Sequence, residues 1–172
     1  MSDTPLPIRR RFVACFQKQD CSQTLGQALE TFYAVNADRF SRPTPTDDWT
    51  RLLAAHDVCH VLFGVNTSLV DETLGDFWTM LGTDVGIRQY LAYLNNPEAK
   101  ALLAQAGWRA LLQAMWFALP LIWQVWRRSR QMSQPWKLWD YEAHLATPLD
   151  ELRRDHHLHI IPYVDAPPAF GA

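Results

Sequence analysis

The stretch 46–81 constrains the fold most strongly, because it contains two helical patterns separated by a short turn. Thr46 or Asp47 can cap the first helix, and Gly64 is a typical helix stop. Ser68 can then cap the second helix. The apolar face of the second helix repeats at helical spacing and consists of Val70, Leu74, Phe77, Trp78 and Leu81. The sequence therefore predicts a helix, a turn and a second helix.

Four residues with metal-binding side chains fall on these two helices. His56 and His60 are four residues apart, so a helix places them on one face, about 6 Å apart along its axis. Asp57 precedes His60 by three residues and is also its neighbour on the helix surface. Imidazole nitrogens and carboxylate oxygens are ligands of divalent metals such as zinc, and Glu72 of the second helix can supply the fourth.

The two histidines are expected to face the core. The apolar residues on their side of the helix are Trp49, Leu52, Leu53 and Phe63. A buried polar group without a partner costs roughly 1–3 kcal/mol, so two inward imidazoles need a partner. A hydrogen-bonded pair of core histidines is the simpler alternative, but the ligand chemistry favours a metal. The predicted metal ligands, which are also the predicted catalytic residues, are His56, Asp57, His60 and Glu72.

Other parts of the chain also follow helical patterns. A short helix is expected at 8–18, and a longer one follows Ser22 as its N-cap. The run 41–46 contains two prolines and interrupts the helices. A last short helix is expected at 149–155.

The predicted fold class is all-α, because no alternating run is long enough to build a sheet. At 172 residues the chain most simply forms one domain. We therefore expect a single-domain helical bundle over residues 1–172, with loose tails at 1–7 and 164–172. Its metal site is expected between two consecutive helices.

The segment 110–126 is nearly all apolar and has arginines just outside it. Its length reaches the lower edge of what a membrane-spanning helix needs. Gln113, Pro120 and Gln124 argue against spanning, so a buried or interfacial helix with a kink at Pro120 is expected. Tryptophans beside arginines suit a membrane interface, and the segment can also line a pocket for a long apolar ligand. Alternatively, the segment 110–126 only fills the hydrophobic core and contacts neither a ligand nor a membrane.

Charge and cysteine content limit the remaining possibilities. The net charge of −2 gives no reason to expect nucleic acid as a partner. Three cysteines without a C-x-x-C pair do not suggest a disulfide framework, and a reducing compartment fits best. No signal or organelle-targeting segment is evident, so a cytoplasmic location is expected. His156, His157 and His159 can bind metal, but solvated histidines are the favoured interpretation.

The pattern H-D-x-x-H, eleven residues and then E resembles the signature of the coenzyme Q biosynthesis protein 4 family. The segment Pro148–Pro162 is also similar to the closing helix of that family. The resemblance implies an all-helical fold and one divalent metal, with zinc preferred over magnesium, manganese or iron. It assigns the metal to the four residues of the pattern, which are His56, Asp57, His60 and Glu72.

The resemblance also implies a function in ubiquinone biosynthesis. The expected ligand is a polyprenylated ring precursor or another isoprenoid lipid, bound by a peripheral protein on a bacterial-type membrane. The expected role is replacement of the C1 carboxyl of the ring by hydroxyl, organisation of other ubiquinone-biosynthesis proteins, or both. A homo-oligomer is compatible with these roles.

Three alternatives remain open. A zinc metallohydrolase is suggested by the two histidines of the H-x-x-x-H pattern, with Asp57 in the place of the usual glutamate base. An HD phosphohydrolase is suggested by the His56-Asp57 pair, but no histidine precedes position 56 to complete its ligand set. A lipid-binding scaffold with a bound metal and no turnover is the third.

Overall fold

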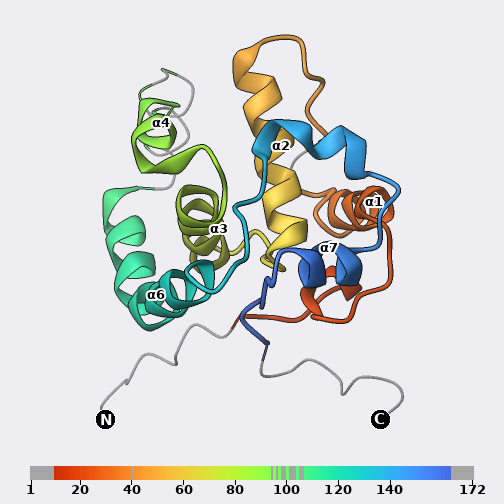
Figure 1. Cartoon of the computed structure of the whole chain (residues 1–172). Helices are drawn as coiled ribbons and strands as arrows, with labels where there is room; N and C mark the ends of the chain where they lie inside the picture. Colours follow the sequence, from red (N-terminus) through yellow and green to blue (C-terminus); the bar gives the residue numbers. More distant parts are fainter. Residues whose placement is uncertain are drawn as a thin grey trace.

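The computed structural model describes residues 10–39, 41–93, 95, 97, 100, 104 and 107–163. The described residues form helices and no strands, which confirms the predicted all-α fold (Figure 1). The elements in chain order are η1 (Cys15–Gln17), α1 (Leu25–Val35), α2 (Asp48–Leu62), α3 (Leu69–Gly82), α4 (Gly86–Tyr93), α6 (Trp108–Ser129), η2 (Leu138–His144) and α7 (Leu149–Asp155). The tails expected at 1–7 and 164–172 lie outside the described residues.

Helix α2 occupies the middle of the molecule. It packs against α1 on one side and α3 on the other, and α3 in turn packs against α6 (Figure 1). One hydrophobic core joins these helices, and its largest fully buried apolar side chains are Trp78, Trp136, Phe16, Phe32 and Phe63. The metal-binding pattern therefore lies on two central helices that are packed on both sides.

The boundaries of α2 and α3 follow the predicted capping residues. The carboxylate of Asp47 accepts a hydrogen bond from the backbone N–H of Thr50 at 2.8 Å, and Ser68 Oγ accepts one from the N–H of Asp71 at 3.1 Å. Gly64 has a φ of +66°, the left-handed conformation that ends a helix. A Cβ at this position would lie 2.8 Å from Ile160 Cδ1, so the end of the Ile160 side chain would have to move.

A fully buried arginine ties three segments together at the C-terminal end of α2. Arg153 of α7 donates hydrogen bonds to the carbonyl oxygens of Val61 and Leu62, both at 2.9 Å. It also donates to the carbonyl oxygens of Phe16 and Lys18. The last carbonyls of a helix have no partner within the helix, and this guanidinium supplies one.

The helix predicted at 8–18 is wrong for the residues that the structure describes there. The chain forms only the short 3-10 helix η1, because the Gln17 side chain accepts hydrogen bonds from the backbone N–H groups of Val13 and Ala14. These N–H groups therefore bind a side chain instead of starting an α-helix.

Cys15 and Cys21 form a disulfide, contrary to the expectation from the cysteine content. The turn between them brings their Cα atoms to 5.5 Å, within the usual range for a disulfide. Cys59 is a free, buried thiol.

Helix α6 is buried on one face and exposed on the other. It contains Pro120, and its ribbon changes direction along its length, as the predicted kink requires (Figure 1). Ala114, Ala118 and Val125 are buried against the core. The large apolar residues exposed on α6 are Trp108, Leu112, Met115, Trp116, Leu119, Trp123 and Trp126. No helix within the described part of the chain is long and apolar enough to cross a membrane.

Candidate metal centre

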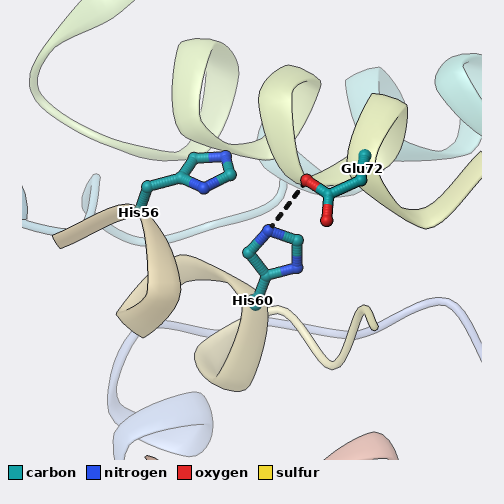
Figure 2. A group of neighbouring side chains, drawn as sticks. All are labelled: His56, His60 and Glu72. Carbon is teal, nitrogen blue, oxygen red and sulfur yellow. Dashed lines mark ion pairs between the residues drawn. The ribbon is translucent and has the colours of Figure 1, made fainter. Parts of the chain in front are cut away.

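Two histidines of α2 and a glutamate of α3 form a group that can hold a metal ion. The side chains of His56, His60 and Glu72 converge between the two helices (Figure 2). Each offers one ligand atom, and these atoms lie within 4.8 Å of one another. His60 is almost fully buried, whereas the Glu72 side chain is 41% exposed. The group is therefore closed on the histidine side and open beside the glutamate.

The orientation of His60 is fixed by its hydrogen bond on the far side of the ring. Its Nδ1 lies 3.0 Å from the carbonyl oxygen of Asn66, which can only accept a hydrogen bond. The proton therefore belongs on Nδ1, and Nε2 faces the Glu72 carboxylate at 3.4 Å. Phe32 stacks on the ring and holds its plane. Metal-binding histidines commonly donate the other ring N–H to a carbonyl in this way.

The space between His60 and Glu72 stabilises positive charge. Burial lowers the pKa of His60, but the negative charges of Glu72, Asp57 and Asp76 raise it more, so the pKa lies at about 9. Burial raises the pKa of Glu72, but the positive charge of His60 outweighs this and lowers it overall. When no metal is bound, a proton on His60 Nε2 neutralises the charge of the Glu72 carboxylate. A metal ion at this position would take the place of that proton.

His56 presents a buried nitrogen that lacks a hydrogen bond. Its Nε2 is inaccessible to solvent and has no hydrogen-bond partner. The ring lies edge-on to His60, with centroids 4.7 Å apart, and Nε2 lies 3.4 Å from Asp76 Oδ1. A divalent cation would give this orphaned nitrogen a partner, so the residues present fit a metal.

The structure places the fourth predicted ligand, Asp57, outside the group that converges. Asp57 Oδ2 accepts a hydrogen bond from the hydroxyl of Tyr33 at 2.9 Å. Burial raises the pKa of the Asp57 carboxyl, and this outweighs the opposing charges of His60 and His56. Asp57 therefore contributes negative charge near the group, while its carboxylate is bound to α1.

Two residues of α3 at this site were not predicted. Asp76 faces His56, and Gly75 lies against the ring of His60. Asp76 could have been found from sequence, because it follows Glu72 by four residues and must share its helix face. The role of Gly75 depends on the distance between α2 and α3, and the spacing of residues in the sequence does not indicate that distance.

The histidines near the C-terminal end do not join a metal-binding group among the described residues. His156 Nδ1 bonds to the carbonyl oxygen of Leu152 at 2.9 Å, and His159 is exposed.

No protein-family model matches the chain, and comparison with curated proteins gives no match. The likeness to the coenzyme Q biosynthesis protein 4 family therefore depends on the residues of the pattern themselves.

Proposed function

We propose that this is a divalent-metal protein of ubiquinone biosynthesis that binds a polyprenylated ring precursor at a membrane surface. The observation that carries the metal is the arrangement of His60, whose Nδ1–H is bound to Asn66 while Nε2 faces Glu72. Two imidazoles and a carboxylate are a ligand set that suits zinc. The substrate class is what the resemblance of the motif to the coenzyme Q biosynthesis protein 4 family implies.

The three residues have different parts in binding. His60 stacks on Phe32 of α1 and lies edge-on to His56, so the two histidines would be the firm ligands. Glu72 is partly exposed and marks the side from which a ring carboxylate can approach. A bound metal would act there as a Lewis acid toward an oxygen of the substrate. His56, His60 and Glu72 would fix the position of the metal, and the carboxylates around it would supply negative charge.

The proposed reaction replaces the C1 carboxyl of the ring by hydroxyl. The bond between C1 and the carboxyl carbon breaks and carbon dioxide leaves, while a bond from C1 to oxygen forms. With dioxygen as oxidant, the balance needs two electrons and two protons from an external donor and releases one water. Organisation of the other biosynthetic proteins around the bound precursor is the non-catalytic form of the same proposal.

The outer face of α6 supports the membrane part of the proposal. Its exposed tryptophans include stacked Trp123 and Trp126, with ring centroids 4.6 Å apart. Helix α6 contains no acidic residue and has Arg127 and Arg128 in its last turn. An apolar face with tryptophans and arginines suits the boundary between lipid headgroups and acyl chains.

A basic depression adjoins the C-terminal end of this face. It has a volume of about 290 Å³ and is lined by Gln124, Arg127, Arg128, Gln131 and His159. All five side chains can donate hydrogen bonds, and none is acidic. The depression therefore suits the phosphate of an anionic phospholipid headgroup.

The metal and the ligand can be tested on the purified full chain. Elemental analysis should find one equivalent of divalent metal, and native mass spectrometry after organic extraction should find a prenylated aromatic compound. His60→Ala should lose the metal, whereas His159→Ala serves as the matched control and should retain it. Stoichiometric metal in His60→Ala would contradict the proposed centre. Metal without lipid in the wild type would favour a hydrolase instead.

A further inference from the structure

The turn between α2 and α3 contains the carbonyl group that orients His60. The Nδ1 atom of His60 lies 3.0 Å from the backbone oxygen of Asn66, and the backbone N–H of Val65 donates to the carbonyl oxygen of His60 at 2.9 Å. The turn and the histidine are therefore bonded to each other through both the ring and the backbone. The direction in which His60 Nε2 points depends on the position of this turn.

A buried amide at the end of α1 holds the turn. Asn36, the C-cap residue of α1, is 2% exposed. Its Nδ2 donates hydrogen bonds to the carbonyl oxygen of Phe32 at 2.8 Å and to Asn66 Oδ1 at 3.0 Å. Its Oδ1 accepts a hydrogen bond from the hydroxyl of Thr67 at 2.7 Å. The side chain of Asn36 therefore joins the last turn of α1 to two consecutive residues that precede α3.

The partners of Asn36 determine which way its amide faces. A backbone carbonyl only accepts hydrogen bonds, so the group that faces the oxygen of Phe32 must be the NH2. The bond to Phe32 completes the end of α1, where helix carbonyls have no partner within the helix. The bonds to Asn66 and Thr67 are not needed for that purpose, and they fix the turn instead.

Helix α1 also contacts His60 directly. Phe32, one turn before Asn36, stacks on the imidazole with ring centroids 5.3 Å apart and an angle of 28° between the planes. One turn of α1 therefore touches the face of the ring through Phe32 and reaches its Nδ1 side through Asn36. Outer partners of this kind orient metal-binding histidines, and loss of one lowers metal affinity by about 10- to 100-fold.

We propose that Asn36 is a positioning residue of the metal centre and acts on His60 through Asn66. This inference rests on the proposed metal centre and leaves its ligand set unchanged. The path runs from the Asn36 amide to the Asn66 side chain, and from the Asn66 carbonyl to His60 Nδ1. It makes α1 part of the centre, although the three converging residues lie on α2 and α3.

Zinc titration of the full chain against a chromophoric chelator tests this path. Asn36→Ala and Asn66→Ala should each weaken zinc binding about tenfold and change the visible spectrum of bound cobalt(II), which reports ligand geometry. Both substitutions break one contact, so the double variant should lose little more than either alone, whereas independent effects would multiply to about a hundredfold loss. Asn66→Asp retains the acceptor for Asn36 and should bind zinc at least as tightly as the wild type.

A stability control and a metal-free measurement separate positioning from capping of α1. Leu25 is fully buried on α1, about 16 Å along the helix axis from Asn36. Leu25→Ala should melt at a lower temperature but bind zinc as the wild type does. In the metal-free, isotopically labelled chain, NMR should show slow solvent exchange of the His60 Nδ1 proton in the wild type and Leu25→Ala. The exchange should be faster in Asn36→Ala and Asn66→Ala.

Each failure has its own pattern. Wild-type zinc affinity and cobalt spectrum in folded Asn36→Ala, with loss of zinc in His60→Ala, would overturn the positioning role alone. Multiplied losses in the double variant would overturn the path through Asn66. Equal zinc binding by the wild type and His60→Ala would overturn the metal centre and this inference together.

Discussion

Gly75 of α3 lies directly against the imidazole of His60. A Cβ at position 75 would lie 3.3 Å from His60 Cε1 and 3.4 Å from Nε2, which is closer than such contacts normally are. The absence of a side chain at this position allows the ring to reach between α2 and α3. A side chain at position 75 would therefore require the imidazole that faces Glu72 to shift by a few tenths of an ångström.

Gly75→Ala should separate metal binding from stability. Alanine favours a helix by about 1 kcal/mol over glycine, so the metal-free variant should melt no lower than about the wild type. The added methyl group should displace His60 and weaken zinc binding by at least about tenfold. Isothermal titration with zinc measures the affinity. Thr73→Ala on the same helix is the control, and equal zinc affinity in Gly75→Ala and wild type would contradict the proposed contact.

The metal-free protein should lose stability as the pH rises through the range in which His60 deprotonates. The pKa of His60 is raised from its ordinary 6.5 to about 9 in the folded chain. A raised pKa stabilises the folded state fully below pH 6.5, and this contribution disappears as the pH rises through about 9. Calorimetry of the chelated protein should therefore show this loss, and His60→Asn should lack it.

The zinc-saturated protein should show the opposite trend over the same range. Zinc and the proton compete for His60 Nε2, so zinc binds more tightly as the pH rises toward 9. The increase in melting temperature caused by zinc should grow between pH 6.5 and 9. A constant increase over this range would show that His60 is not a ligand.

Arg153→Met should destabilise the chain strongly. The substitution retains an apolar stem but leaves the buried carbonyls of Phe16 and Leu62 without their donor, and that of Val61 with only the backbone N–H of Gly64. Each unsatisfied buried group costs about 1–3 kcal/mol, so the free energy of unfolding should fall by more than about 3 kcal/mol. Arg154→Met, at the exposed neighbouring position, should change it by less than about 0.5 kcal/mol. Urea denaturation measures both.

The outer face of α6 should bind anionic bilayers. Wild-type protein should sediment with vesicles of phosphatidylcholine and phosphatidylglycerol, and less with phosphatidylcholine alone. Each arginine near a membrane surface contributes about 1 kcal/mol, so Arg127→Gln should bind roughly fivefold more weakly. Trp116→Ala should also reduce binding, because this ring is 72% exposed. Arg51→Gln on α2 is the charge-matched control, and equal loss there would contradict the assignment of this face.

The sequence predicted the local features of the site correctly because they depend on neighbours along the chain. Capping by Asp47 and Ser68 and the stop at Gly64 set the two helices and the turn between them. The four-residue spacing of His56 and His60 then placed both on one face. These features need no knowledge of tertiary packing.

Several features that depend on packing between elements were not predicted, although the approach of Glu72 to His56 and His60 was. The carboxylate of Asp57 accepts a hydrogen bond from Tyr33 of α1, a partner that its spacing within α2 does not indicate. The prediction of an N-terminal helix was wrong because the Gln17 side chain accepts hydrogen bonds from the N–H groups of Val13 and Ala14. The disulfide between Cys15 and Cys21 was not predicted because it depends on the turn formed there. The hydrogen-bond partner of a polar side chain depends on how the elements pack, and residue spacing in the sequence does not reveal this packing.

The hydrogen bonds of Arg153 have a consequence for how the chain is made. The carbonyls at the end of α2 are completed by a residue that lies about ninety positions later in the chain. During synthesis, α2 leaves the ribosome well before its capping guanidinium does. A nascent chain that ends before position 153 therefore holds His60 on a helix whose end is unfinished. Stable capture of a metal at His60 should therefore follow the emergence of Arg153 from the ribosome.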